Sequence, residues 1–511
     1  MLSTGSSSRA ARASTLPDSV SDRLEALLFP SAAAAMLVFI FVGIGRSLWL
    51  DEANSVSIAS GSFFGIFERL KADNNFPVYY VLLHFWVRLF GESEPALRLL
   101  SGLAYLAGTI TVYWGGRTLF RDKRTGLSAA FCYLVSTQAI RQAQNVRMYT
   151  LLGLLSALST VFFCRIFEKE DDSQRPWMWY VAVNAVGALT HLWFAFVLVG
   201  QCAAVIIWRR RRLRAFLAAS AASYLPFLVL WSPALYAQLH NGATGWMPRF
   251  EPVFVAHAFM DYYGGPYALA FYAACGVLIF YNRGQKPADA TLARLLITCF
   301  GVSLALPLAI SAVKPIFWPG RYTIIGLAPL ALWLGAALAR SAPRPALAIF
   351  CYLTLATVLV AHIWQRDVNS ESGLPESNSD KAATGLLLQL GKPGDALVFT
   401  SLSRATLDYY LRRAGAQSRF LEIGFPSENS VHLGWGDTKV DDRRLPLLKA
   451  EAEDDASRLA GMARGTRVWV LYGASLAVSS ILRDALNRRL KFEREIPLTG
   501  PYYLQVLEFS H

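Results

Sequence analysis

The sequence predicts an all-α polytopic membrane protein with about 11 transmembrane helices, followed by a small extracytoplasmic α/β domain. Of its 511 residues 54% are hydrophobic and only 17% are charged, whereas soluble globular chains carry about 25% charged residues. Apolar runs long enough to span a bilayer recur from Leu27 to Trp364 and then stop. Beyond about Arg366 the sequence is typical of a soluble domain of about 145 residues.

The chain therefore divides into three parts. Residues 1–26, rich in Ser and Ala, are expected to form a disordered cytoplasmic tail. Residues 27–366 form the membrane part, and residues 367–511 the soluble domain. The first apolar run has no convincing cleavage site and many spans follow it, which favours an uncleaved anchor over a signal peptide.

The distribution of charge predicts the orientation. The net charge is +13, but residues 367–511 hold 18 Lys and Arg against 19 Asp and Glu, so the excess lies in the membrane part. There it forms short clusters between apolar runs, around Arg121, Arg209–Arg214, Arg283 and Arg340. This pattern is the positive-inside signature of a membrane protein and not a nucleic-acid surface. With all clusters inside, we expect a cell inner membrane protein whose C-terminal domain is periplasmic.

The expected spans follow from these runs and clusters. They cover about residues 27–44, 95–120, a segment ending near 142, 146–167, 177–191, 194–208, 215–233, 266–281, 291–313, 322–339 and 346–364. The large first external loop contains an amphipathic segment, Val56–Leu70, and an apolar stretch, Val78–Phe90. The second is short for a span and contains His84 and Arg88, so we expect a helix at the membrane interface.

The C-terminal domain alternates helical and extended patterns. Helices are expected at residues 382–390, 405–413 and 480–490, and strands at 396–400, 467–472 and 504–509, which is typical of an α/β layer domain. It contains no cysteine, whereas all six cysteines of the chain fall in predicted spans without metal-ligand spacing, where we interpret them as small buried hydrophobic residues.

Two adjacent acids open the first external loop. Asp51 and Glu52 follow the first span directly, beside Trp49. Either acid could serve the N-terminus of the helix that follows, and either could be functional, because ionisable groups at a membrane interface are costly without a purpose. The residues alone leave both interpretations open.

Cations form the second candidate group. Three arginines stand at the outer start of inward-running spans, and a lysine and a histidine lie at the same depth: Arg98, Arg147, Arg321, Lys314 and His191. A single arginine at a helix end is usually a snorkelling anchor. Several cations on the outer face oppose the positive-inside preference and indicate an anionic partner, for which a lipid phosphate is the obvious candidate.

An ordered set of motifs resembles family-39-like glycosyltransferases of the C superfamily, which include protein O-mannosyltransferases and aminoarabinose transferases acting on lipid A. The motifs are Trp49-Leu-Asp51-Glu52, Phe76-Pro77-Val-Tyr79-Tyr80-Val-Leu-Leu-His84-Phe-Trp86, Glu94-Pro-Ala-Leu-Arg98-Leu, Gln144-Asn145-Val-Arg147-Met-Tyr149, Leu189-Thr190-His191 and Gly320-Arg321-Tyr322. The resemblance covers about Leu27 to Ala339, and it leaves the C-terminal domain without a motif.

The resemblance implies a single-displacement, inverting transfer from a polyprenyl-phosphate-linked sugar donor within the lipid bilayer. It implies Asp51 as the general base, with Glu52 as the second candidate, and it makes the arginines, Lys314 and His191 candidates for stabilising the donor phosphate. No cofactor or metal is expected, and the acceptor is a glycolipid, a polysaccharide or a protein.

The chain departs from the family pattern in two places. Asn75-Phe76-Pro77 stands where the family often has His-Pro-Pro, and Gln144-Asn145-Val146-Arg147 where it often has Gln-Glu-Ala-Arg. The second change removes an acid, which weakens any expectation of a metal or second carboxylate near Arg147. Two other functions remain as alternatives: a transporter or flippase of lipid-linked sugars, which should show polar helices at the bilayer midplane, and a non-catalytic envelope assembly factor, which should tolerate changes at Asp51.

Overall fold

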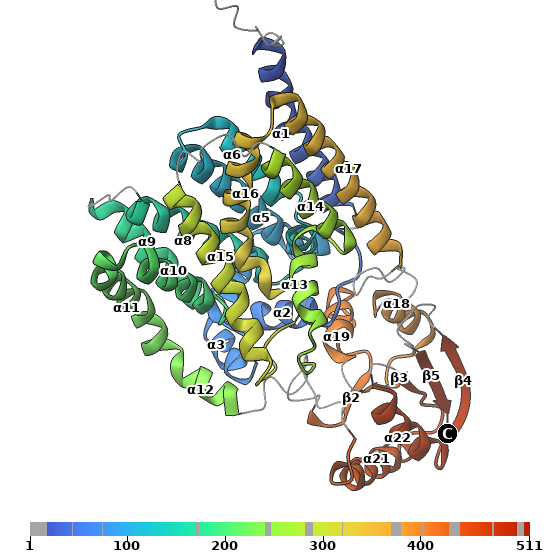
Figure 1. Cartoon of the computed structure of the whole chain (residues 1–511). Coiled ribbons are helices and arrows are strands. Elements are labelled where there is room, and N and C mark those ends of the chain that lie inside the picture. The colour runs from blue at the N-terminus through green and yellow to red at the C-terminus, as the bar shows by residue number, and fades with distance from the viewer. Residues whose placement is uncertain are drawn as a thin grey trace, which may run out of the picture.

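The computed structural model describes residues 18–510 except 43, 74, 169–172, 241–246, 282–289, 319, 369–379, 401–402, 429–439, 473–474 and 498–504. A bundle of helices makes up most of the molecule, and a β-sheet with its own helices lies at one end (Figure 1). The first helix begins at Asp18, inside the segment expected to be a disordered tail, and residues 1–17 of that tail lie outside the described residues.

Each predicted span overlaps a helix or a pair of helices. The bundle consists of α1 (Asp18–Phe41), α2 (Leu50–Ser60), α3 (Phe63–Ala72), α4 (Pro77–Phe90), α5 (Glu94–Leu119), α6 (Lys123–Leu134), α7 (Thr137–Ala143), α8 (Tyr149–Glu168), α9 (Gln174–Ala188), α10 (Phe194–Trp208), η1 (Arg210–Arg212), α11 (Leu213–Leu230), α12 (Ser232–His240), α13 (Val253–Tyr263), α14 (Pro266–Tyr281), α15 (Ala290–Ser311), η2 (Tyr322–Gly326), α16 (Leu327–Ser341) and α17 (Arg344–Val368).

Six helices are long and apolar enough to cross a membrane, or seven if α13 and α14, bent by 76° at their junction, form one span; this count covers only the described residues. The prediction of about 11 also includes shorter segments, such as α9 and α10. One predicted span, ending near residue 142, is broken into α6 and α7, where the Ser136 side chain accepts a hydrogen bond from the backbone of Ala139 at 3.4 Å. The chain is a multi-pass membrane protein.

The centre of the bundle is α16, of which 89% of the spanning window is buried. It packs so closely on α6 that a side chain at Gly335 would overlap the backbone of Ala129. Small residues permit this approach, which is how helices associate tightly where lipid removes the hydrophobic driving force.

The first external loop folds into three helices. The predicted amphipathic segment is split in two: α2 ends at Ser60, and α3 begins after Ser62, whose hydroxyl accepts a hydrogen bond from Gly65 N at 3.1 Å. A serine that caps a helix in this way stops the preceding helix from continuing. The predicted interfacial helix is α4, which starts at Pro77, a residue suited to the first turn.

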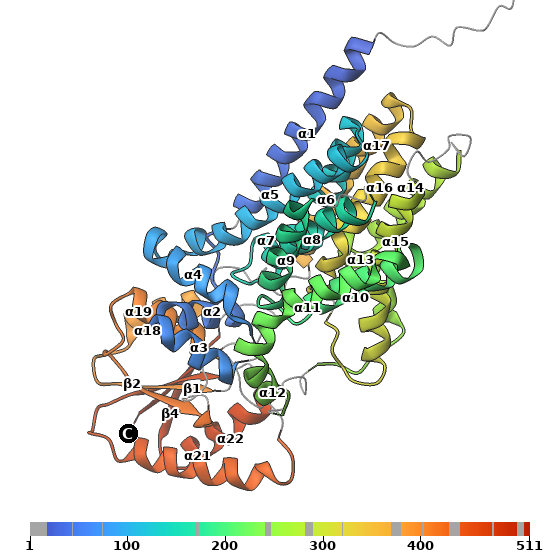
Figure 2. The ribbon, with the colours of Figure 1, turned by 90° about the vertical axis from the view of Figure 1, so that its left-hand side faces the viewer.

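The C-terminal part is a five-stranded sheet of order β2-β1-β3-β5-β4 between two layers of helices (Figure 2). Its strands are β1 (Ala396–Thr400), β2 (Leu421–Phe425), β3 (Val468–Tyr472), β4 (Lys491–Pro497) and β5 (Gln505–Ser510). β1 pairs in parallel with β2 and β3, while β5 is antiparallel to β3 and β4.

Strand β1 is fully buried, and its alternate residues pack into two separate hydrophobic cores, one on each face of the sheet. Ala396 and Val398 pack with α21 (Arg444–Ala460) and α22 (Leu476–Asn487), whereas Leu397 and Phe399 pack with α18 (Asp380–Leu390) and α19 (Arg404–Arg413). Helices on both faces explain why this strand reads as a continuous apolar run. The predicted α/β layers are present, but β2, β4 and α21 were not predicted.

Helix α19 joins the sheet to the bundle. Its Leu407 and Leu411 face the sheet, while Tyr409 and Tyr410 belong to the hydrophobic core of the bundle. The Tyr410 hydroxyl accepts a hydrogen bond from Leu48 N at 2.8 Å. Three ion pairs reinforce the contact: Arg412–Glu92 at 2.6 Å, Arg413–Glu94 at 2.5 Å and Lys381–Glu94 at 3.3 Å. The C-terminal part is therefore fixed to the loop that carries Asp51.

Candidate active site

Asp51 lies between two arginines. Its Oδ2 is 3.3 Å from Arg321 Nη1 and 3.9 Å from Arg147 Nη2. The Asp51 side chain is 24% exposed, against 13% and 9% for the two arginines. The structure thus brings together three predicted site residues from distant parts of the sequence, and the carboxylate between the two guanidinium groups remains accessible.

A tight turn places Arg321. Gly320 has a φ of +79°, a conformation that glycine adopts without strain. Its N–H donates to Asp261 Oδ2 at 2.7 Å, and its carbonyl accepts from Gln142 Nε2 at 2.8 Å. The Arg321 guanidinium then lies over the ring of Trp49 at 5.1 Å from its centroid. Arg321 is held by backbone and by an aromatic face, so its direction toward Asp51 is built into the fold.

Arg147 is held from three sides. It donates to Asn75 Oδ1 at 3.2 Å, to Ser55 Oγ at 3.4 Å and to Tyr80 Oη at 3.4 Å. Its Nε is buried and has no hydrogen-bond partner in the described chain. Since Ser55 stands one helical turn after Asp51, both side chains lie on the face of α2 that meets Arg147.

Glu52 has a different environment from its neighbour. Its Oε1 accepts from Arg98 Nε at 2.9 Å and from Val146 N at 3.0 Å, and its Oε2 accepts from Arg98 Nη2 at 2.6 Å and from Trp49 N at 3.3 Å. Both side chains of the Glu52–Arg98 pair are 0% exposed. The bond to Trp49 N caps α2, so the helix-start role that the sequence left open for either acid is filled by Glu52.

Arg98 is equally occupied. Besides Glu52, it donates to the carbonyls of Ile44, Arg46 and Ser47 at 2.7, 2.7 and 3.0 Å. A guanidinium has five N–H donors, and these contacts use all five. The four acceptor positions of Glu52 are likewise filled. Neither side chain has a donor or acceptor position left for a substrate.

His191 and Lys314 were expected to add positive charge. The His191 ring packs against Tyr322, Tyr149 and Phe76, with centroids 5.3, 5.9 and 6.5 Å apart, and its Nδ1 accepts from Trp193 N at 3.1 Å. Burial, with the nearby Arg147 second, lowers the pKa of His191 to about 3. At neutral pH it is therefore an uncharged part of an aromatic wall, without the positive charge that the sequence interpretation assigned to it. Lys314 is exposed after the end of α15, and within the described residues no ion pair joins it to Asp51.

Several residues near the site were not predicted from the sequence. Trp49 and Trp318 cover the Arg321 guanidinium, and Asp261 holds the turn before it. A signal for Asp261 was present, because a carboxylate inside an apolar membrane segment usually has a specific partner. Two further polar atoms, Trp49 Nε1 and Asn145 Oδ1, are buried and lack hydrogen-bond partners among the described residues. In the same set of residues, no three His, Cys, Asp or Glu side chains converge as metal ligands would.

Comparison with known proteins extends this picture. Residues 74–236 match the sequence family described as dolichyl-phosphate-mannose-protein mannosyltransferase. The whole chain resembles the crystal structure of ArnT from Cupriavidus metallidurans in the apo state, with 14% identity, a TM-score of 0.61 and coverage of 94% of this chain and 97% of that one. Residues 74–236 of this chain thus match a glycosyltransferase family, and the chain as a whole shares the fold of ArnT. Both findings agree with the resemblance that the motifs indicated, and the family match covers the motifs from Phe76 to His191.

Two more solved structures share this fold. ArnT from the same organism bound to undecaprenyl phosphate gives a TM-score of 0.62 at 14% identity, over 93% of this chain and 97% of that one. The archaeal oligosaccharyltransferase AglB from Archaeoglobus fulgidus, in complex with an inhibitory peptide and a dolichol-phosphate, gives 0.50 at 12% identity, over 94% and 74%. No curated protein sequence matches this chain significantly. The match to ArnT includes the C-terminal part, for which the sequence offered no motif.

Proposed function

We propose that this protein is a glycosyltransferase, which transfers a sugar from a polyprenyl-phosphate carrier to a hydroxyl group of a glycolipid, polysaccharide or protein, with inversion at the anomeric carbon. The observation that carries the proposal is the Asp51 carboxylate between Arg321 and Arg147, at 3.3 and 3.9 Å. A base and two cations in contact are the groups that a displacement at a sugar phosphate requires. The lipid phosphates named in the ArnT and AglB structures support the choice of carrier.

In this proposal the Asp51 carboxylate is the general base. The acceptor oxygen attacks the anomeric carbon while its proton passes to the Asp51 carboxylate. The bond from the anomeric carbon to the phosphate oxygen breaks, and its electron pair leaves with the polyprenyl phosphate. Glu52 has no part in this proposal, because its four acceptor positions already bind Arg98, Val146 and Trp49.

The arginines receive the phosphate. Arginine matches phosphate with two parallel hydrogen bonds, and both guanidinium groups are nearly buried, where their interaction with the developing negative charge is weakly screened by water. The ion pair between Asp51 and Arg321 also implies that the donor binds before Asp51 can act as a base. A phosphate that takes over the Arg321 donors releases Asp51 from its partner, so the carboxylate becomes a free base only when the donor is bound.

The proposed orientation puts this site at the outer face of the cell inner membrane and the C-terminal part in the periplasm. It rests on the basic clusters: Arg121 lies between α5 and α6, Arg209–Arg214 lie where α10 is followed by α11, and Arg340 lies at the end of α16, whereas Arg283 falls outside the described residues. Short loops rich in Lys and Arg stay in the cytoplasm. The sheet then lies on the other side, together with α2 and Asp51.

The test of the base is Asp51→Asn. Asparagine keeps the shape of aspartate, and the start of α2 is capped by Glu52, so the fold should be retained while transfer falls at least about 100-fold. The purified full chain would be assayed in detergent with a polyprenyl-phosphate hexose or pentose carrying a radiolabel. The acceptor would come from a comparison of the lipids and glycans of a deletion strain with those of its parent.

Asp122→Asn is the matched control, since Asp122 is also an acid at a helix start and accepts hydrogen bonds from Arg124 N and Thr125 N. It should keep wild-type transfer. If Asp51→Asn keeps most of its transfer activity at wild-type protein level, Asp51 is not the base and the mechanism fails.

A further inference from the structure

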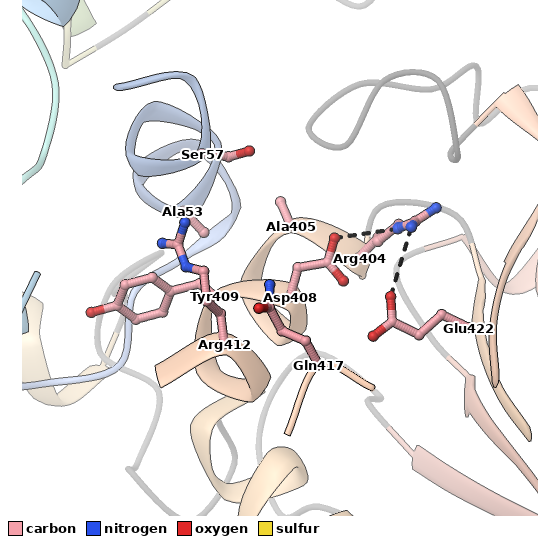
Figure 3. Close-up of a pocket in the computed structure, with 9 residues that line it drawn as sticks. All are labelled: Ala53, Ser57, Arg404, Ala405, Asp408, Tyr409, Arg412, Gln417 and Glu422. Atoms are coloured by element: carbon pink, nitrogen blue, oxygen red, sulfur yellow. Dashed lines mark hydrogen bonds and ion pairs between the residues drawn. The ribbon is translucent and has the colours of Figure 1, made fainter. Parts of the chain in front are cut away.

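Two acids with buried carboxyl groups lie near the candidate active site, and their partners differ. Asp408, on α19, lies in a cavity of about 290 Å³ beside α2 and pairs there with Arg404 at 3.3 Å (Figure 3). Asp261, on α13, is only 7% exposed. Among the described residues, the hydrogen bonds that Asp261 accepts come from a backbone N–H and a hydroxyl, and not from an arginine or a lysine. A buried carboxylate is costly without strong partners, so this arrangement indicates a specific role for Asp261.

Asp261 binds the chain on both sides of Arg321. Its Oδ2 accepts a hydrogen bond from Gly320 N at 2.7 Å and another from the Thr323 hydroxyl at 3.4 Å. The same hydroxyl accepts from Gln138 Nε2 at 2.6 Å. One carboxylate oxygen therefore ties together the residue before Arg321 and the second residue after it.

Gly320 is the residue of this segment whose conformation most needs support from outside. Its φ is +79°, and glycine reaches many other conformations with equal ease. Asp261 holds the N–H of Gly320, and Gln142 Nε2 donates to its carbonyl at 2.8 Å. Because that carbonyl and the N–H of Arg321 belong to one planar peptide unit, the two side chains fix the backbone from which Arg321 extends.

The position of the Arg321 side chain matters at the distances seen in the site. Its Nη1 lies 3.3 Å from Asp51 Oδ2, and a guanidinium must meet a phosphate at hydrogen-bond distance to stabilise it. A misplacement of about 1 Å, caused by a change away from the reacting atoms, can cost about 100-fold in rate. A residue that fixes the Gly320 turn can therefore affect the reaction without touching the substrate.

Arg141 lies on the same side of the turn as Asp261. A methyl group added at Gly320 would lie 3.5 Å from Arg141 Nη2 and 3.7 Å from Asp261 Oδ1. Asp261 could thus act as a hydrogen-bond acceptor for the turn or as a negative charge opposite Arg141. The bond from Gly320 N, at 2.7 Å, is at the short end of the range for N–H···O bonds, which favours the role as acceptor.

We propose that Asp261 is a positioning residue of the transfer reaction, an inference that rests on the proposed function. By holding Gly320 and Thr323, it keeps Arg321 where the guanidinium meets the Asp51 carboxylate and receives the donor phosphate. Asp261 touches neither the sugar nor the phosphate, and it acts through Arg321.

The test is a double-mutant cycle between Asp261 and Arg321, measured on the purified full chain in detergent. Asp261→Ala should raise the KM for the lipid-linked donor about tenfold, through loss of a hydrogen bond to a charged acceptor, and leave the KM for the acceptor unchanged. In the Arg321→Ala background the same change should have an effect of less than about twofold, because no arginine is left to position. A general structural defect would have its full effect in both backgrounds.

Binding of undecaprenyl phosphate to the same four proteins repeats the cycle without the reaction. The readout is the change in tryptophan fluorescence, since Trp49 and Trp318 lie over the Arg321 guanidinium. Asp261→Ala should weaken binding about tenfold in the wild-type background and have little effect in the Arg321→Ala background.

Asp261→Asn distinguishes the hydrogen bond from the charge. The amide oxygen of asparagine can still accept from Gly320 N, so this variant should retain most of the affinity for the donor. A loss as large as that of Asp261→Ala would mean that the charge opposite Arg141 is what matters, and it would overturn the inference. Gln142→Met, which removes the hydrogen bond to the Gly320 carbonyl, takes the place of Asp261→Ala in the cycle if the latter fails to fold.

Two controls are matched to these changes. Tyr263→Phe removes a hydrogen bond from the same end of α13, which the Tyr263 hydroxyl donates to the Cys132 carbonyl at 3.3 Å. Asp408→Ala removes the other acid, which has no contact with the Gly320 turn among the described residues. Both variants should keep the wild-type KM for the donor.

The inference is overturned if Asp261→Ala leaves the KM for the donor unchanged, or if its effect and that of Arg321→Ala simply add. Asp51→Asn separates the two proposals. Retained transfer in Asp51→Asn refutes the proposed mechanism, while the cycle on undecaprenyl phosphate binding still decides the role of Asp261. Lost transfer together with additive effects refutes only the positioning role.

Discussion

Replacing Glu52 should destabilise the protein far more than replacing its neighbour Asp51. Glu52→Gln keeps the size of the side chain but removes its charge, which leaves the Arg98 guanidinium, 0% exposed, without its carboxylate. Breaking a buried ion pair by removing one partner costs about 3 to 5 kcal/mol. Asp51 is 24% exposed, and its pairs with Arg321 and Arg147 are longer, at 3.3 and 3.9 Å, so Asp51→Asn should cost less than Glu52→Gln.

The assay is thermal unfolding of both variants in one detergent, followed by tryptophan fluorescence, together with the yield of monodisperse protein after extraction. Glu52→Gln should unfold at a clearly lower temperature and be recovered poorly, while Asp51→Asn resembles the wild type. The double variant Glu52→Gln with Arg98→Met should regain part of the loss, because no uncompensated charge stays buried. If Glu52→Gln unfolds within about 1 °C of the wild type, the pair has no structural role and Glu52 again becomes a candidate base.

Three further predictions follow from the site and its orientation. Arg321→Ala should raise the KM for the lipid-linked donor more than that for the acceptor in steady-state kinetics, and unchanged donor dependence would make Arg321 a structural anchor. Since the folded pKa of His191 is about 3 against an ordinary 6.5, the unfolded chain binds a proton in that window that the folded chain does not, so stability should fall as the pH falls from 6.5 toward 3. His191→Phe should reduce this slope, by up to about 1.4 kcal/mol per pH unit, when unfolding temperatures are compared at pH 7, 6 and 5; equal slopes would contradict the assignment. A reporter active only in the periplasm should work when fused at His511, and activity of a cytoplasm-only reporter there would reverse the orientation.

The local sequence was sufficient to predict most helices and strands, but it was not sufficient to predict how the candidate active site is assembled. The apolar runs predicted the helices of the bundle, and the continuous apolar run Ala396–Thr400 matches β1 in both bounds. The charged edge strand β4 does not alternate regularly between apolar and polar residues, so its sequence did not predict a strand. In the structure its pairing with β5 shifts register between Phe492 and Arg494. Helix α21 did carry a readable signal, because Leu448, Ala452, Ala456 and Leu459 recur at helical spacing on its buried face.

The different roles of Asp51 and Glu52 could not be read from the sequence. Both acids stand in the first turn of α2, and local rules treat them alike. Their difference arises from partners far along the chain: Arg98 and Val146 surround Glu52, whereas Arg321 approaches Asp51. The resemblance to known glycosyltransferases indicated Asp51, but the physical reason for preferring it is tertiary.

The way α19 attaches to the bundle limits how such enzymes can be recombined. Glu92, on the short turn between α4 and α5, and Glu94, the first residue of α5, meet Arg412, Arg413 and Lys381 from the C-terminal part. A chimera that joined this bundle to the C-terminal part of a relative would bring these two acids against unrelated side chains. The junction at Leu48, three residues before Asp51, would lose its tyrosine hydroxyl at the same time. The unit that can be exchanged between homologues is therefore the C-terminal part together with the first external loop.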